Sequence, residues 1–388
     1  MKNANLSRIL DKLGPFLALI VVFAIFAILG KEKFCQWGTI NDILTICVIV
    51  GITALGATMV IISGGIDLSV GCTIAAVTVI VAHVLNWKIG NEFILQQHPV
   101  LWPLVAATIG VAWGGLVGLI IGLAVVGYIG FITAFLSALL LAYGLTCWGT
   151  PWYISLIAFL LVAGALTILN YRWNRKIPLP PFIVTLGLWT SIRGLAKWFA
   201  NGSGVYPKLT EVNGQSIWLN LMMTDIKLGK LTIPMPGVWI WLFAALCVGL
   251  LLRYTRFGRH IYAIGSNEQT ARLCGINVPQ TRILIYLLAG LLTGLAGVLR
   301  YSWLGMGDPT TDIGTELFVI ASVVIGGASL TGGSGGILGT VIGTLIIMIV
   351  YIGCTVLGLR NFVQEIVTGA IIIFAVALDQ LRHSDPTK

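Results

Sequence analysis

The chain has 388 residues, of which 57% are hydrophobic and only 10% are charged, and its formal net charge is +9. A soluble domain carries about 25% charged residues, so this composition excludes an ordinary soluble globular protein. Apolar runs of about 17–25 residues recur along the chain, each long enough to cross a bilayer as a helix. The runs do not alternate apolar and polar residues, which disfavours an outer-membrane barrel. The predicted fold class is therefore all-α, a polytopic helical membrane protein.

In chain order, the apolar runs predict about twelve spans. They cover residues 14–30, 43–62, 68–86, 101–126, 130–148, 152–170, 181–199, 237–252, 283–303, 316–326, 336–356 and 362–379. The first run is longer than the apolar core of a signal peptide and no cleavage site follows it, so we predict an uncleaved span. The run 316–326 is too short to cross alone. Three alternatives remain for this run: the helix starts before residue 316, it is only half-buried, or it is one arm of a broken helix.

The basic residues predict the orientation of these spans. They gather at the N-terminus, at 172–176, at 253–259 and in the C-terminal tail. With twelve spans, all four clusters fall on one side, which the positive-inside rule makes cytoplasmic. Both termini are then cytoplasmic, and the polar segment 200–236 is an external loop with short interfacial pieces. The positive charge therefore reports topology rather than a nucleic-acid partner.

Two glycine-rich clusters predict breaks in membrane helices. Gly64–Gly71 and Gly326–Gly333 share glycine at their first, second and eighth positions, leucine at the fifth and Ser or Thr at the sixth. Glycine adopts backbone conformations that end a helix, so we predict broken helices at Gly64–Gly71 and Gly326–Gly336. An internal duplication explains the match, and so does chance in a chain with 47 glycines.

Asp67 is the most informative single residue. A carboxylate among apolar spans is costly unless it is satisfied. One interpretation is that Asp67 caps the following helix, whose first residues would be Leu68 and Ser69. The other is that Asp67 contacts the solute or the gating machinery, because broken membrane helices are tolerated where they line a polar path. The two roles are compatible.

The polar stretch from Ser266 to Gly275 predicts a short, well-capped helix between two spans. Ser266 fits an N-cap, with Gln269 reaching back to it. Gly275 fits the left-handed position that ends a helix, so the helix should run from Asn267 to Cys274. A two-turn helix is marginal in water by itself. It either docks on another protein or is a plain connector.

Several motifs together resemble one family of transport proteins. They read IISGGIDLSVG (61–71), PPFIVTLGLWTSIRGL (180–195), NGSGVYP (201–207), FGRHIYAIG (257–265), GSNEQTARLCGINV (265–278) and VVIGGASLTGGSGGILGTVIG (323–343). In order and over nearly the whole chain, they resemble the simple-sugar (ribose/xylose-type) ABC importer permeases, within the group that includes branched-chain amino-acid permeases. The resemblance implies a single permease domain over 1–388, in the bacterial inner membrane, that works as a homodimer.

The resemblance also implies partners and site residues. A separate ABC ATPase would bind ATP and Mg, with no cofactor on this chain, and a periplasmic or surface solute-binding protein would deliver the solute. The loop 253–282 would be the coupling loop. Its candidate coupling residues are Ser266, Glu268, Gln269, Arg272 and Gly275. The candidate pathway and gating residues are Asp67, Ser69, Thr185, Glu316 and Phe318.

Two departures from the family pattern bear on these expectations. Family members have about ten spans, whereas residues 130–180 here predict an inserted helical pair. The family often has an aspartate two residues after the glutamate that matches Glu316, and Phe318 replaces it here. This change puts the usual pentose or hexose specificity in question.

Missing motifs narrow the function. The chain has no P-loop and no H-E-x-x-H, so it is not expected to be an enzyme and its energy must come from elsewhere. A gradient-driven transporter remains an alternative, although only Asp67 and Glu316 offer charges for ion coupling. An ABC permease for branched-chain amino acids or nucleosides is another alternative. A membrane enzyme or scaffold would need a polar constellation that the sequence lacks.

Overall fold

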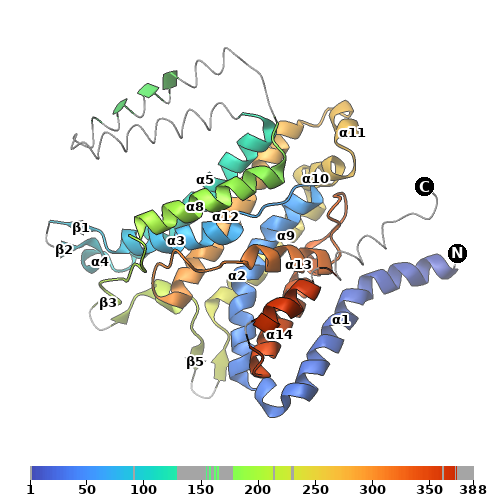
Figure 1. Ribbon diagram of the computed structural model, residues 1–388, viewed down its shortest axis with the longest axis horizontal. Coiled ribbons are helices and arrows are strands. Elements are labelled where there is room, and N and C mark those ends of the chain that lie inside the picture. The colour runs from blue at the N-terminus through green and yellow to red at the C-terminus, as the bar shows by residue number, and fades with distance from the viewer. Residues whose placement is uncertain are drawn as a thin grey trace.

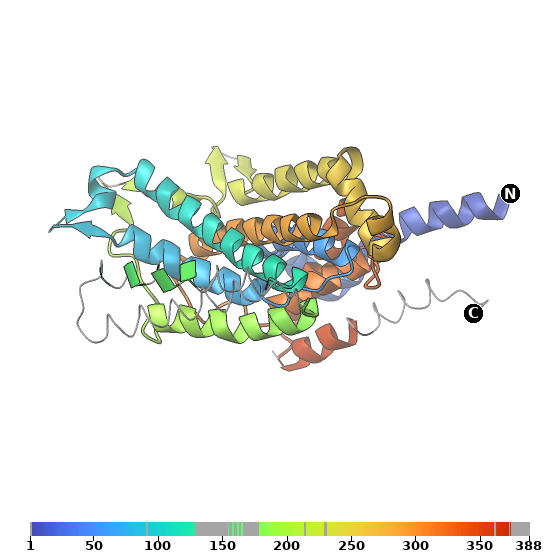
Figure 2. The same ribbon diagram turned by 90° about the horizontal axis from the view of Figure 1, so that it is seen from above.

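A computed structural model describes residues 2–90, 92–128, 178–212, 215–228, 231–360 and 362–371, with isolated positions between 154 and 165 and at 373. Helices packed side by side make up most of it, with short β-hairpins toward one end and α10 and α11 toward the other (Figures 1 and 2). Six of the described helices are long and apolar enough to cross a membrane. The predicted all-α polytopic membrane fold is confirmed.

The helices have the following bounds. They are α1 (Lys2–Phe34), α2 (Trp37–Ile62), α3 (Val70–Leu85), α4 (Ile94–Gln97), α5 (Leu101–Val126), α8 (Pro181–Phe199), α9 (Pro236–Tyr254), α10 (Arg256–Ser266), α11 (Glu268–Leu273), α12 (Val278–Leu304), α13 (Thr315–Ile325), α14 (Ile337–Val356), a last helix Phe362–Ile371, and the 3₁₀ turn η1 (Trp218–Leu221). Every predicted span outside 130–170 overlaps one of these helices, although the part of the span 362–379 that follows Ile371 lies outside the described residues apart from position 373. The span 130–148, and all but isolated positions of 152–170, lie outside the described residues.

Three antiparallel two-stranded hairpins complete the described structure. They pair β1 (Lys88–Ile89) with β2 (Glu92–Phe93), β3 (Glu211–Val212) with β4 (Gln215–Ser216), and β5 (Ile226–Leu228) with β6 (Leu231–Ile233). The segment predicted as a loop at 200–236 thus contains two hairpins and a 3₁₀ turn. Its polar and proline-rich sequence keeps these pieces short.

α5 packs closely against α12. Gly114 and Gly118 of α5 face Gly290 and Gly294 of α12, and a Cβ on Gly114 would overlap the carbonyl oxygen of Gly290. Small residues four apart let two membrane helices bring their backbones together. This contact fixes the positions of the elements that carry the site.

The apolar helices α3 and α13 are both too short to cross a bilayer. The 16 residues of α3 and the 11 residues of α13 span less than the hydrocarbon core, which is about 30 Å thick, because a helix rises only about 1.5 Å per residue. Non-helical backbone precedes each of them, at 63–69 and at 305–314. The short run predicted at 316–326 is therefore one arm of a broken span.

The described loops lie on two sides of the bundle, whereas the predicted basic loop at 172–176 and the C-terminal tail lie outside the described residues. On one side, the indole N–H of Trp37 donates to Asp225 at 3.0 Å, and the N–H of Lys208 donates to the side chain of Asn86 at 2.7 Å. On the opposite side, the breaks after α2 and α13 contact α10. We call these the β-hairpin side and the α11 side.

Candidate functional site

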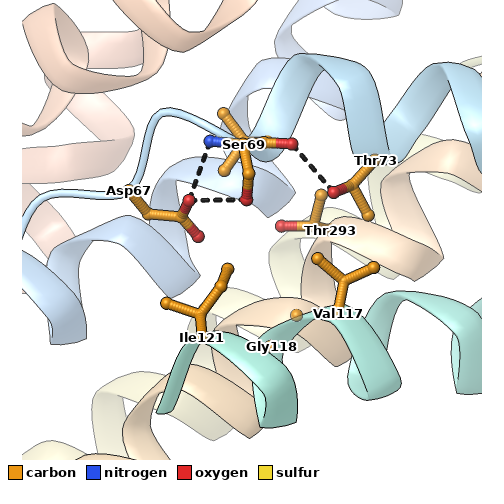
Figure 3. A pocket seen from close by; sticks show the side chains of 9 residues that line it. Asp67, Ser69, Thr73, Val117, Gly118, Ile121 and Thr293 are labelled. Carbon is orange, nitrogen blue, oxygen red and sulfur yellow. Dashed lines mark hydrogen bonds between the residues drawn. The ribbon is translucent and has the colours of Figure 1, made fainter. Parts of the chain in front are cut away.

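The break between α2 and α3 is organised by Asp67. Its Oδ1 accepts hydrogen bonds from the N–H of Ser69 at 2.8 Å and from the Ser69 hydroxyl at 2.7 Å (Figure 3). The helix begins at Val70 with Ser69 at its N-cap position, not at Leu68 as expected. Asp67 therefore orders the chain just before the helix instead of capping its first turn, because its carboxylate reaches only two residues ahead.

Asp67 also faces a small pocket between three helices. The pocket encloses about 160 Å³, including the part open to its surroundings. Its lining residues are Asp67, Ser69, Val70, Thr73, Val117, Gly118, Ile121, Gly290 and Thr293. Sites for small molecules usually measure about 300–1,000 Å³. The pocket is too narrow for a bound solute in this conformation, so any solute path here opens by movement of α3, α5 or α12.

The structure brings most of the predicted pathway residues close to this break. The hydroxyl of Thr185 on α8 reaches the carbonyl oxygen of Ile66 at 3.5 Å. Glu316 is buried at the start of α13, and its Oε2 sits where a Cβ on Gly71 would come within 2.6 Å. These contacts join α3, α8 and α13 around the break.

Phe318 lies apart from this group. Its ring packs edge-on against Tyr351 of α14 with 5.3 Å between ring centroids. The described residues thus use Phe318 for packing between α13 and α14. A polar residue at this position would face the same aromatic neighbour.

On the α11 side, the two glycine-rich breaks meet each other and α10. The N–H of Gly333 donates to the carbonyl oxygen of Ile62 at 2.8 Å. Gly265, near the end of α10, lies directly over this bond, since a Cβ there would overlap the Ile62 oxygen and come within 2.6 Å of the Gly333 nitrogen. The hydroxyl of Tyr262 donates to the carbonyl oxygen of Gly335 at 2.9 Å. The end of α10 therefore rests on both breaks.

The short helix after α10 is present, but its cap differs from the prediction. α11 runs from Glu268 to Leu273, and the side chain of Asn267 accepts from the N–H of Thr270 at 2.9 Å. Ser266, predicted as the N-cap, is the last residue of α10 instead. The predicted capping box with Gln269 is therefore wrong, because α10 continues one residue into the expected cap.

The C-terminal end of α11 agrees with the sequence. Gly275 has φ +81°. Its N–H donates to the carbonyl oxygen of Arg272, and the N–H of Ile276 donates to the carbonyl oxygen of Ala271. This pair of hydrogen bonds is typical of a helix that ends at a left-handed glycine. Glu268 makes ion pairs with Arg272 and, at 2.6 Å, with Arg282 of α12. Glu268 thus ties α11 to the start of the next span.

Sequence reasoning missed three side chains. Leu273 is 88% exposed at the end of α11. Arg193 on α8 is buried and donates to the carbonyl oxygens of Pro309 and Thr311. Arg300 on α12 pairs with Asp312 at 2.8 Å. The sequence did contain a signal for Arg193 and Arg300. Each is a single arginine within an apolar run, and a charge inside a membrane span needs partners.

Comparison with known proteins gives one family and several close relatives. Residues 123–376 match the family described as "Branched-chain amino acid transport system / permease component". The ribose import permease of Escherichia coli (strain K12) is 31% identical over 371 residues, which cover 95% of this chain and 93% of that one. No solved structure matches the chain.

Two further relatives have similar coverage. The ribose import permease of Bacillus subtilis (strain 168) is 32% identical over 383 residues, covering 99% of this chain and 97% of that one. The D-allose transport system permease of Escherichia coli (strain K12) is 29% identical over 381 residues, covering 98% and 95%. All three relatives are permease components that import sugars.

Proposed function

The chain belongs to the ABC importer permease family, and from this premise we propose that it forms the membrane pathway of a bacterial importer for a simple sugar. Permeases of this family are transport subunits rather than enzymes, and they work with an ATPase and a solute-binding protein. For this chain, the proposed solute is a pentose or hexose, as in the ribose and allose importers that it resembles. Two copies would assemble in the inner membrane with both termini in the cytoplasm, which makes the α11 side cytoplasmic.

The contact of α10 with both breaks is the observation that carries this proposal. Gly265 touches the backbone at Ile62 and Gly333, and the first break leads directly to the buried Asp67. A displacement of the α10–α11 hairpin (residues 256–273) would therefore reach the polar start of α3 without passing through flexible side chains. Packed backbone transmits displacement well because it has little room to deform.

The ATPase would act on this hairpin through α11. Leu273 offers an exposed apolar side chain, and Arg272 offers a mostly exposed guanidinium, to a groove on the ATPase. Binding and hydrolysis of ATP, with Mg, would occur on that partner. Closure of two ATPase subunits would then shift the equilibrium between outward-open and inward-open arrangements of the helices.

Breaking α11 tests this function. Arg272→Pro places proline inside the short helix, which costs about 3 kcal/mol or more, and Arg272→Ala removes the same ion pair without breaking the backbone. In proteoliposomes with the ATPase and the sugar-loaded binding protein, Arg272→Pro should abolish uptake and sugar-stimulated ATP hydrolysis. Arg272→Ala should lower both activities only in part, because it removes one charged contact with the ATPase and keeps the helix and Leu273. Normal coupled uptake by Arg272→Pro would reduce α11 to a connector and remove the proposed route of coupling.

A further inference from the structure

Two oppositely charged side chains are buried together between α8 and α13. Arg193 is 6% exposed and Glu316 is 8% exposed. They are close enough to attract each other electrostatically, yet no ion pair forms between them among the described contacts. A buried charge without full compensation costs several kcal/mol, so this arrangement needs a reason.

Each of these side chains keeps polar atoms without a partner. One nitrogen of the Arg193 guanidinium donates to Pro309 at 3.1 Å and to Thr311 at 2.6 Å. Its Nε and its other terminal nitrogen have no acceptor among the described residues, and Oε2 of Glu316 has no donor there. The indole N–H of Trp189, one turn before Arg193, lies near the Glu316 carboxylate and has no other acceptor among the described residues. Two nitrogens of Arg193 and Oε2 of Glu316 are therefore left without partners there, with the Trp189 N–H close to the same carboxylate.

Arg300 of α12 offers a comparison, because it is also largely buried but has partners for its guanidinium. Its guanidinium pairs with Asp312 at 2.8 Å, donates twice to the hydroxyl of Thr311, and lies over the ring of Trp303. Both arginines bind the segment 305–314, Arg193 through backbone carbonyl oxygens and Arg300 through the side chains of Thr311 and Asp312. Only Arg193 retains buried donors after doing so.

We propose that Trp189, Arg193 and Glu316 form a binding station for a hydroxyl group of the transported solute, an inference that rests on the proposed sugar function. A hydroxyl donates one hydrogen bond and accepts two. It can donate to Oε2 of Glu316 while it accepts from Arg193 or Trp189. Bonds to charged groups are shorter and stronger than neutral ones, so one hydroxyl would satisfy both buried charges.

Gly71 lets the Glu316 carboxylate pack directly against the start of α3. A Cβ at position 71 would overlap the carbonyl oxygen of Asp312 and come within 2.6 Å of Oε2 of Glu316, so any other residue would displace both groups. Gly71 lies in the first turn of α3, next to the break that Asp67 organises. The station and the Asp67 pocket therefore adjoin the same helix start, α3, and a shift of that start would change both.

The test compares sugars that differ by one hydroxyl. Uptake into proteoliposomes is measured with saturating, fully loaded binding protein, for ribose, allose and arabinose and for their monodeoxy derivatives. In the unmodified chain, loss of the hydroxyl that occupies the station should lower uptake about tenfold. Trp189→Phe and Glu316→Gln should lower uptake of the parent sugar and leave uptake of that deoxy derivative unchanged. The ratio of the uptake rate of the parent sugar to that of its deoxy derivative should therefore fall toward one.

Trp113→Phe is the matched control, since Trp113 on α5 also has a buried indole N–H without a partner among the described residues. It should leave the ratio unchanged. If Trp189→Phe and Glu316→Gln slow every sugar by the same factor, or if Trp113→Phe also erases the ratio, the station does not exist. Trp189→Phe keeps the aromatic packing, so it remains informative if Glu316→Gln fails to fold. If the unmodified chain takes up none of these sugars, the proposed sugar-import function is overturned instead.

Discussion

The break at Gly64–Gly71 and the break at Gly326–Gly333 end their helices in the same way. Gly64 has φ +81° and Gly327 has φ +89°. In each case the next N–H bonds back into the last turn, Gly65 to Val60 at 2.9 Å and Ala328 to Val323 at 3.1 Å. The left-handed glycine is the first of its pair in one break and the second in the other. Both helices therefore end at a left-handed glycine, whose position within the glycine pair differs by one residue.

The side chains that follow differ in charge. In the first break, Asp67 accepts from the N–H and the hydroxyl of Ser69. At the matched positions of the second break, the hydroxyls of Ser329 and Thr331 bond to each other at 2.8 Å. The similarity therefore extends to hydrogen bonding, which is more than shared glycine content explains. Because only the first break carries a carboxylate, we expect it to serve transport and the second to serve structure.

The largest effect is expected where both breaks meet. Gly265→Ala would drive a Cβ into the backbone of Ile62 and Gly333, and such overpacking costs about 1–3 kcal/mol. We expect uptake to fall at least about tenfold while the chain still inserts in the membrane. Gly187→Ala on α8 is the control, since a Cβ there meets nothing within 4 Å. Equal uptake by the two variants would show that the breaks do not depend on α10.

The second-largest effect on uptake is expected from substitution of Asp67. Asp67→Leu leaves the buried N–H and hydroxyl of Ser69 without their acceptor, which costs about 1–3 kcal/mol, and it removes the charge from the pocket. Asp67→Asn keeps an acceptor of the same shape and should retain the fold. If transport needs the charge, Asp67→Asn will be stable by thermal unfolding but slow in uptake. A stable, fully active Asp67→Leu chain would exclude both roles.

The second break should tolerate the equivalent change. Ser329→Ala removes the hydroxyl that bonds to the Thr331 hydroxyl at 2.8 Å and accepts from the N–H of Thr331 at 3.4 Å, and such neutral hydrogen bonds are worth about 1 kcal/mol each. Uptake should change less than about threefold, with a small fall in the unfolding temperature. A loss of uptake as large as that of Asp67→Leu would mean that the two breaks have equal roles in transport.

These contrasts also show what the sequence could predict. The helix breaks were predictable because paired glycines have a direct backbone consequence, and Gly275 was predictable for the same reason. The cap of α11 was misplaced by one residue because Ser266 and Asn267 are both good caps, and only the length of α10 decides between them.

The tertiary contacts of the site were beyond sequence reasoning. Nothing local indicates that Gly265 would lie against Ile62, or that Glu316 would lie beside Arg193. Those neighbours are set by packing among α3, α8, α10 and α13, which are distant in the chain. Phe318 illustrates the converse, since a family position suggested a solute contact and the fold gives it an aromatic partner.

The smallest effect concerns the N-cap of α11. Asn267→Ala removes the acceptor for the N–H of Thr270 and should cost about 1 kcal/mol of helix stability. Amide exchange at 271–274 should then become a few times faster, since 1.4 kcal/mol corresponds to about tenfold. Ser266→Ala should leave that exchange unchanged, because Ser266 belongs to α10. The opposite pattern would restore Ser266 as the cap and lengthen α11 by one residue. If Asn267→Ala also weakens uptake, the order of α11 matters for transport, as expected if α11 acts on the two breaks through α10, which contacts both.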